Sequence, residues 1–214
     1  MPNSLNSTNR TQNLEHASSQ HFDLIVVGGG ITGSGIALDA ASRGMKVLIL
    51  DKQDFAAGTS SRSTKLIHGG LRYLKQLEFG LVRQVGRERA ILYQNAPYLV
   101  YPEKLLLPIY KSGSLGFTST SVALWFYDLL AGVQKKERRK MLSKQKAIKE
   151  EQMLSEYGLL GAGLYYEYRT DDARLTMEVL KTAVGYGAHA FNYLELTDFI
   201  QSDGQITGVK TTDL

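Results

Sequence analysis

Hydrophobic residues near the N-terminus switch between continuous runs and helical spacing, a pattern typical of α/β proteins. The run FDLIVVGG at 22–29 is β-branched and bounded by glycines, which predicts a strand buried on both faces of a parallel sheet. Residues 31–44 have apolar positions at helical spacing and end at Gly44, as a helix with a glycine cap would. KVLILD at 46–51 predicts a second buried strand, so this part forms a βαβ unit.

The middle of the chain changes to longer helical patterns around one strand. Apolar spacing predicts helices at about 80–95 and 116–132. Residues 103–110 predict a strand in which Pro108 indicates an edge position or a bulge, because proline donates no ladder hydrogen bond. The charged stretch from 133 to about 157 favours further helix.

The last part of the chain returns to alternating strands and helices. Residues 163–171 alternate like a strand, and 171–187 form an amphipathic helical pattern with an aspartate cap and Gly187 near its end. From 188 to 214 we expect two strands, an Asp-Gly turn and a third strand. This order suggests a nucleotide-binding domain made from two segments, with a substrate-side region inserted between them.

Composition restricts the class of protein. The 214 residues are 43% hydrophobic and 21% charged, as in ordinary soluble globular proteins. Without cysteine, the chain forms no disulfides, cysteine-ligated zinc sites or cysteine-bound iron–sulfur clusters. A net charge of +4 is too weak to indicate nucleic-acid binding, and no apolar run reaches the ~18–20 residues that span a bilayer. Residues 1–20 are polar and lack periodicity, which predicts a disordered or loosely docked tail.

The first strand–helix turn carries the glycine pattern of dinucleotide-binding proteins. Gly28, Gly30 and Gly33 form G-x-G-x-x-G between a predicted strand and a predicted helix. We expect the first glycine to allow the tight turn, the second to let a pyrophosphate approach, and the third to let helix and strand pack closely. Asp51 ends the second strand, 21 residues after Gly30, where its carboxylate can accept hydrogen bonds from a ribose diol.

A stretch rich in hydrogen-bond donors follows this unit. Residues 59–76, TSSRSTKLIHGGLRYLKQ, contain six hydroxyl side chains, five basic ones counting His68, and no acidic residue. NAD and FAD share the adenosine diphosphate half, so the glycine pattern alone leaves the dinucleotide open. The donor-rich stretch favours FAD, because its groups can face a pyrophosphate, a flavin ring and an anionic substrate.

Three segments closely resemble FAD-dependent glycerol-3-phosphate dehydrogenases. They are VGGGITGSGIALDAASRG at 27–44, DFAAGTSSRSTKLIHGGLRYLKQLEFGLV at 54–82 and GAGLYYEYRTDDARLTMEVLKTA at 161–183. The resemblance covers most of residues 22–212 and is nearest to the bacterial aerobic type, with glycerophosphate oxidases similar over the same stretches. It implies an α/β fold, with a Rossmann-like FAD-binding domain (DAAO/glutathione-reductase-2 type) interleaved with part of an α+β substrate domain.

The resemblance also implies a division of the chain into four parts. We expect a disordered tail at 1–21, a first FAD-binding segment at 22–80, a substrate-side or membrane-facing region at 81–165, and a second FAD-binding segment at 166–214. Members of the family are much longer, so we expect this chain to be a fragment. The general base and the main phosphate-binding arginines would then lie in the part after Leu214.

The activity implied by the resemblance is oxidation of sn-glycerol 3-phosphate to dihydroxyacetone phosphate with FAD. Hydride would pass to flavin N5 and the electrons then to a membrane quinone. The protein would be cytoplasmic and peripheral on the inner face of the cell membrane, with a homodimer as a further expectation and no nucleic-acid partner. The alternatives are a glycerophosphate oxidase that makes hydrogen peroxide, an inactive flavoprotein fragment, and an NAD-binding protein.

The resemblance transfers site roles to particular positions, and no metal ligand is among them. Residues matching cofactor positions are Gly28, Gly30, Ile31, Thr32, Gly33, Asp51, Lys52, Thr59, Ser60, Ser61, Ser63, Thr64, Lys65, His68 and Gly69. Residues matching positions near the substrate are Arg72 and Tyr73. We expect no catalytic residue in this chain, apart from His68 as a candidate base, and a role of His68 in the flavin loop is favoured over it.

Two further groups of residues allow both a structural and a functional interpretation. Asp171, Asp172 and Arg174 fit a helix cap with a tethering ion pair better than a catalytic group. Trp125, Phe126, Leu129 and Leu130 precede the basic run KKERRK at 135–140. They fit a core-facing helix or, about equally well given the resemblance, a surface that dips into an anionic membrane.

Overall fold

The β-branched runs near the N-terminus form a parallel sheet with a short strand from the far end of the chain. In the computed structural model, β1 (Leu24–Val27), β2 (Val47–Leu50) and β7 (His189–Phe191) lie side by side in the order β1-β2-β7. The helix α2 (Ile31–Ser42) connects β1 to β2, and Gly44 follows it with a φ of 84°. The predicted βαβ unit is confirmed, although only β2 is buried along its whole length.

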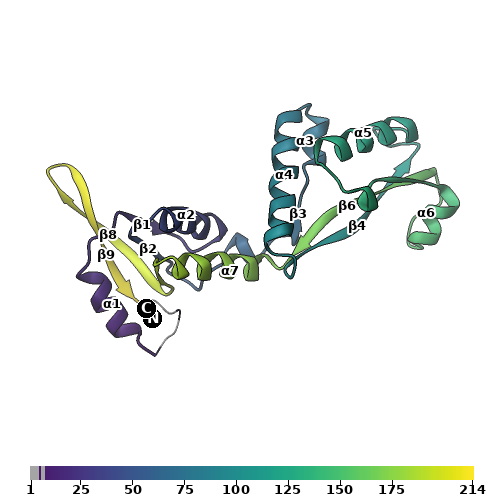
Figure 1. Cartoon of the computed structure of the whole chain (residues 1–214). Coiled ribbons are helices and arrows are strands. Elements are labelled where there is room, and N and C mark those ends of the chain that lie inside the picture. The colour runs from purple at the N-terminus through teal and green to yellow at the C-terminus, as the bar shows by residue number, and fades with distance from the viewer. Residues whose placement is uncertain (1–4, 6–7) are drawn as a thin grey trace. The chain divides into compact units, whose positions relative to one another are not determined.

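The structure describes Leu5 and residues 8–214, apart from the side chains of Arg72 and Lys75. The chain divides into two compact units (Figure 1). Unit 1 comprises Met1–Thr64 and Asp171–Leu214, and unit 2 comprises Lys65–Thr170. The domain boundaries expected from the sequence stay a prediction.

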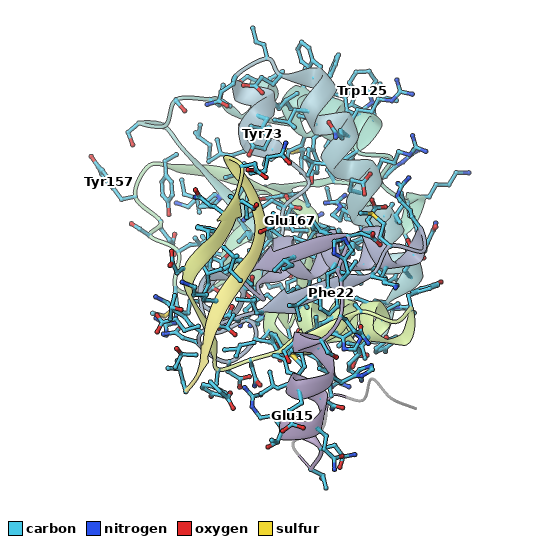
Figure 2. The ribbon with its side chains drawn as sticks, turned by 90° about the vertical axis from the view of Figure 1, so that its left-hand side faces the viewer. Glu15, Phe22, Tyr73, Trp125, Tyr157 and Glu167 are labelled. Carbon is cyan, nitrogen blue, oxygen red and sulfur yellow. The ribbon has the colours of Figure 1, made fainter. Side chains whose placement is uncertain are left out.

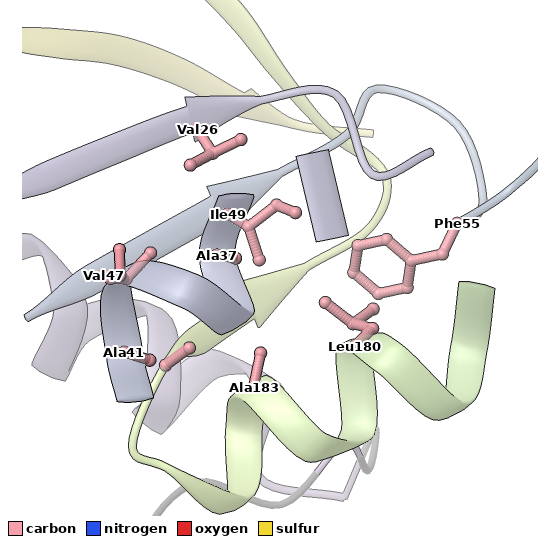
Figure 3. Packing of buried hydrophobic residues seen from close by; sticks show 10 residues of the cluster. Val26, Ala37, Ala41, Val47, Ile49, Phe55, Leu180 and Ala183 are labelled. Carbon is pink, nitrogen blue, oxygen red and sulfur yellow. The ribbon is translucent and has the colours of Figure 1, made fainter. Parts of the chain in front are cut away.

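The core of unit 1 lies where α2 and α7 (Asp172–Gly185) pack beside the parallel sheet. Figure 3 shows Leu180 and Ala183 of α7 pointing toward α2 and the strands. Alanines on both helices allow a close approach, and apolar side chains exclude water from the space between them. The buried members of this cluster are Val26, Ala37, Ala40, Ala41, Val47, Ile49, Phe55, Leu180, Ala183 and Ala188.

The second segment of unit 1 has the predicted caps and turn. Asp171 Oδ1 accepts a hydrogen bond of 3.1 Å from the N–H of Arg174, and so caps α7 as expected. The strands β8 (Leu194–Ser202) and β9 (Gln205–Asp213) form a hairpin. Its turn is Asp203-Gly204, with φ of 52° and 75°, the left-handed pair that favours Asp-Gly at tight hairpins.

The N-terminal segment differs from the sequence prediction. Instead of a disordered or loosely docked tail, residues of this segment form the helix α1 (Arg10–Ser18). Leu14 and Ala17 pack against a small cluster that includes Leu48 and Leu50, and the Arg10 guanidinium donates 2.7 Å to the carbonyl of Asn192. The helix has few apolar positions, so its tertiary contacts, which periodicity does not report, determine its structure.

Unit 2 is built on an antiparallel sheet in the order β3-β6-β4. Its strands are β3 (Leu66–Ile67), β4 (Val100–Tyr110), β5 (Lys140–Ser143), which also pairs with β6, and β6 (Leu159–Thr170). Its α-helices are α3 (Leu71–Lys75), α4 (Phe79–Asn95), α5 (Phe117–Leu130) and α6 (Lys144–Glu150). The two long predicted helices are confirmed, and Pro108 lies on the outer strand β4, next to a register shift at Ile109/Tyr110.

The helix predicted for the charged stretch after residue 132 is wrong. That stretch contains a short 3₁₀ turn, η2 (Lys135–Glu137), then β5 and the two-turn helix α6. Pairing of β5 with β6 and burial of the Glu137 carboxyl against the Tyr168 hydroxyl, at 2.9 Å, override the helical propensity of the charged residues. Within the described part of the chain, no helix has both the length and the apolar character needed to cross a membrane.

Candidate functional site

The turn between β1 and α2 brings two glycines into direct contact. Gly28 has a φ of 109° and donates 2.8 Å to the carbonyl of Leu50, which fixes the end of β1 against β2. A Cβ on Gly33 would lie 1.9 Å from the carbonyl oxygen of Gly28. Only a residue without a side chain therefore lets the first turn of α2 approach the strand this closely.

The start of α2 is arranged to receive an anion. Gly30 is the N-cap residue and provides no side-chain cap, while Ser60 Oγ accepts 2.9 Å from the N–H of Ile31. The N–H groups of Thr32 and Gly33 belong to the same first turn and have no acceptor inside the helix. Together with the positive end of the helix dipole, they suit a phosphate group.

Asp51 joins the glycine turn to the end of β2. Its carboxylate accepts 2.7 Å from the N–H of Gly29 and 2.8 Å from the N–H of Gln53. The sequence predicted Asp51 as an acceptor for ribose hydroxyls and gave no sign of this second role. Each carboxylate oxygen has two lone pairs, so both roles are compatible.

The hydroxyl-rich stretch begins at the same end of unit 1. Residues Thr59–Ser61 form the 3₁₀ turn η1, from which Ser60 reaches the start of α2. Ser63 Oγ donates 2.5 Å to Asp172 Oδ2 at the start of α7. Residues 59–63 thus connect two helix N-termini near the glycine turn, and Asp172 has a structural partner.

The remaining candidates of unit 1 are more exposed. The side chains of Ile31, Thr32, Lys52, Thr59 and Thr64 are exposed, and Ser61 is half-buried. Ile31 and Thr32 lie in the first turn of α2, and the others lie in or next to the loops that follow β2. Their individual contacts with a cofactor stay predictions.

The other sequence candidates belong to unit 2. Lys65 has a φ of 63°, His68 is exposed and Gly69 is buried. Tyr73 lies in α3, in the helical part of unit 2 (Figure 2). The side chain of Arg72 lies outside the part of the chain that the structure describes.

A cavity of about 780 Å³ opens among α3, α5 and the strands β4 and β6. Most of its wall is apolar, and its polar members include His68, Tyr73, Tyr165 and Glu167. The apolar wall includes Leu71, Leu74, Leu77, Leu107, Leu115 and Leu124. A largely apolar cavity with a few convergent polar groups is the usual form of a small-molecule or cofactor site.

Sequence reasoning missed a buried polar network beside this cavity. Glu167 Oε2 accepts 2.6 Å from the N–H of Gly69 and 2.8 Å from Arg89 Nη1, and Glu167 Oε1 accepts 3.1 Å from the Tyr127 hydroxyl. Arg89 Nη1 also donates 2.8 Å to the Tyr127 hydroxyl oxygen. Relative exposures of 4% for Arg89 and 2% for Glu167 show that this is a buried ion pair.

Two sequence signals could have revealed this network. Arg89 follows Val82 and Gly86 at helical spacing on the buried face of α4, where a charged residue needs a partner. Glu167 interrupts a strand of aromatic residues that is buried on both faces. When two buried segments each contain one charged residue, of opposite sign, we expect the two residues to form an ion pair.

The surroundings shift the pKa values of Arg89 and of the two tyrosines next to it. Burial alone lowers the pKa of Arg89, but Tyr127 and Glu167 raise it overall, so the guanidinium stays charged. Burial strongly raises the pKa of Tyr127. Burial and the hydrogen bond to Glu137 raise the pKa of Tyr168 to about 12. Both hydroxyls therefore remain donors over the physiological pH range.

Three features define a dinucleotide-binding protein of the Rossmann type: the glycine turn, the N–H groups of Thr32 and Gly33 in the first turn of α2, and Asp51 after β2. A family model described as FAD dependent oxidoreductase matches residues 23–213. The chain belongs to this family, which confirms the predicted fold class and FAD as its cofactor.

Relatives and solved structures agree with this assignment. The chain is 52% identical over 214 residues to an aerobic glycerol-3-phosphate dehydrogenase of Bacillus subtilis, covering 100% of this chain and 39% of the relative. It is 55% identical over 196 residues to the enzyme of that name from Staphylococcus aureus, covering 91% and 35%. A crystal structure of glycerol-3-phosphate dehydrogenase from Bacillus halodurans complexed with FAD matches at a TM-score of 0.74 and 40% identity, covering 96% and 33%.

Replacing Gly33 with alanine is expected to abolish tight FAD binding, because the new methyl group would overlap the Gly28 carbonyl. Gly35→Ala is the matched control on the same helix, since a Cβ there has no atom within 4 Å. The measurement is FAD retained after purification, with the thermal unfolding midpoint beside it. Equal FAD content in the two variants would contradict the role of Gly33.

Asp51→Ala is expected to weaken FAD binding by roughly 1–3 kcal/mol, the cost of a lost charge-assisted hydrogen bond. Asp51→Asn keeps one acceptor oxygen, so its loss should be smaller. Titration of the cofactor-free protein with FAD measures both. An Asp51→Ala variant with wild-type affinity would show that Asp51 contacts neither the ribose nor a turn that FAD needs.

Proposed function

We propose that this chain is the FAD-binding part of an enzyme that oxidises sn-glycerol 3-phosphate to dihydroxyacetone phosphate. The observation that carries the proposal is 52% identity, along all 214 residues, to an enzyme named for that dehydrogenase activity. The chain spans 39% of the length of that relative, so activity and substrate apply to the whole protein.

In this proposal the residues of unit 1 hold the adenosine diphosphate half of FAD. The first turn of α2, with Gly30, Thr32 and Gly33, receives the pyrophosphate, and Asp51 receives the ribose hydroxyls. A Cβ added to Gly28 would have no atom within 4 Å. The space beside this glycine is therefore open to the pyrophosphate of the cofactor. The residues present therefore fit a dinucleotide.

The hydroxyl-rich stretch holds the remainder of the cofactor. Thr59, Ser61, Thr64 and Lys65 supply donors for the pyrophosphate and the flavin oxygens, as the resemblance implies. We assign His68 to contact with the flavin rather than to removal of the substrate proton. FAD held by these residues would supply the redox chemistry, as acceptor of a hydride from carbon 2 of the substrate and donor of electrons to a membrane quinone.

Arg72 and Tyr73 are the substrate-side residues of the proposal. A guanidinium suits the phosphate group of the substrate, because its planar fork makes two parallel charge-assisted hydrogen bonds. Tyr73 lines the 780 Å³ cavity together with His68, which supports a shared site for flavin and substrate.

A surface on α5 supports contact with a membrane, where a quinone acceptor would be found. Leu124 and Tyr127 form the buried face of the helix, whereas Trp125 is 51% and Leu129 is 63% exposed. The basic residues of 135–140 follow in the chain. Exposed apolar side chains beside cations favour an anionic lipid surface over a core-facing position. We therefore place the protein at the inner face of the cell membrane; a homodimer stays a prediction.

Adding sn-glycerol 3-phosphate without oxygen is expected to bleach the flavin absorbance of the FAD-loaded full-length protein. A quinone analogue should then restore the colour faster than oxygen does. Comparing quinone reduction with hydrogen peroxide yield separates the dehydrogenase from the oxidase. A protein that stays yellow with the substrate, or that binds no FAD, would refute the proposal.

The double variant Trp125→Ser, Leu129→Ser is expected to bind anionic phospholipid vesicles about tenfold more weakly or worse, because each apolar side chain contributes about 1.5–3 kcal/mol when buried. Tyr157→Ser, at a position 92% exposed in another part of unit 2, is the control (Figure 2). Vesicle co-sedimentation measures the binding. Equal binding of both variants and the wild type would exclude α5 as the contact.

A further inference from the structure

Glu167 is a buried carboxylate that both lines the cavity and binds the backbone of the glycine pair. We propose that Glu167, braced by Arg89 and Tyr127, is a positioning residue that fixes the segment His68–Gly70 against the cavity. The inference rests on the proposed function, because it assigns this segment to contacts with flavin and substrate.

The contact between Glu167 and Gly69 is strong and specific. The N–H of Gly69 donates 2.6 Å to Glu167 Oε2, and Gly69 is buried. A hydrogen bond to a charged acceptor is roughly twice as strong as a neutral one, and burial excludes competing water. Because the Arg89 and Tyr127 donors also hold the carboxylate, it cannot rotate away from Gly69 without breaking two other hydrogen bonds.

The glycine pair is pressed directly against this network. A Cβ on Gly69 would lie 1.7 Å from the Tyr127 hydroxyl oxygen and 2.4 Å from Arg89 Nη1. Gly70 has a φ of 90° and is the N-cap residue of α3. Two adjacent glycines have more backbone freedom than any other pair, so the segment needs an external restraint to hold one conformation. Glu167 provides that restraint.

The restrained segment carries groups on both sides that face the cavity. His68 precedes Gly69, and the N–H of Tyr73 donates 2.9 Å to the carbonyl of Gly70. His68, Tyr73 and Glu167 all line the cavity. A shift of Gly69 would therefore move His68 and the first turn of α3 together.

Stability alone does not explain this network. Burying an ion pair removes both charges from water, so its net contribution to stability is generally small, and apolar residues of similar volume can fill such a space equally well. The geometry instead directs a fixed acceptor at one backbone N–H beside a cavity. This is the arrangement expected of a residue that orients neighbouring groups.

A second tyrosine next to Arg89 provides a control. Its guanidinium lies 4.8 Å from the ring of Tyr168, whose hydroxyl donates 2.9 Å to Glu137 Oε2. Tyr168 is buried like Tyr127, but its hydroxyl binds Glu137, whereas the Tyr127 hydroxyl binds Glu167. Tyr127→Phe and Tyr168→Phe thus each remove one buried tyrosine hydroxyl near the Arg89 guanidinium, and only the first of these hydroxyls binds Glu167.

The first test is hydrogen–deuterium exchange in the FAD-loaded full-length protein. In Glu167→Gln and in Tyr127→Phe, amides of the peptide covering 66–74 should exchange about tenfold faster than in the wild type. In Tyr168→Phe that peptide should exchange at the wild-type rate. If Glu167→Gln does not fold, the test uses Tyr127→Phe, which removes a single hydroxyl oxygen and leaves the buried ion pair in place. Wild-type exchange rates for this peptide in the folded Glu167→Gln and Tyr127→Phe variants would overturn the inference, whatever reaction the enzyme catalyses.

The second test is kinetic. Glu167→Gln is expected to lower kcat/KM for sn-glycerol 3-phosphate about tenfold or more and to shift the absorption bands of bound FAD, since small misplacements at a reacting centre are costly. Tyr168→Phe should keep kcat/KM within about twofold, even where it lowers the unfolding midpoint. Faster exchange with unchanged kinetics and spectrum would leave a structural role only and overturn the positioning role. A wild type that binds FAD but is not bleached by the substrate would refute the proposed function, while the exchange test on the FAD-loaded protein would still decide this inference.

Discussion

The approach of α2 to the end of β1 determines the geometry of everything proposed for unit 1. Gly33 meets the Gly28 carbonyl at a distance that admits no side chain, and this fixes where the first turn of the helix points. Asp51, just after β2, and Ser60 of η1 then bind the N–H groups of Gly29 and Ile31 on either side of the N-cap residue. These bonds hold the helix start in place and leave the N–H groups of Thr32 and Gly33 for an anion, as a phosphate-binding site requires.

Unit 2 reaches a similar result by a different physical route. In unit 1 the absence of side chains lets the backbone approach, whereas in unit 2 a buried charge holds the backbone in place. Glu167 of β6 accepts from the N–H of Gly69, and Arg89 of α4 and Tyr127 of α5 both donate to Glu167. Both units thus use glycines whose neighbours leave no room for a Cβ, next to acidic residues that accept from backbone N–H groups.

Local patterns predicted what depends on local chemistry. The βαβ unit, the cap at Asp171 and the Asp-Gly turn follow from residues that lie next to each other in the chain. The helix α1 and the strand β5 could not be predicted this way, because contacts with residues far along the chain stabilise them. The same holds for Glu167 and Arg89, which are 78 positions apart. The only sequence signal of their pairing is that each is a charged residue in a segment whose pattern predicts burial.

The double attachment of Asp51 has a consequence for the thermodynamics of cofactor binding. Backbone N–H groups of Gly29 and Gln53 already hold the carboxylate in one rotamer. A ribose diol would therefore meet an acceptor whose torsional freedom was lost during folding. Such preorganisation lowers the entropy lost on association, so each hydrogen bond to the sugar contributes more to affinity than it would with a mobile side chain.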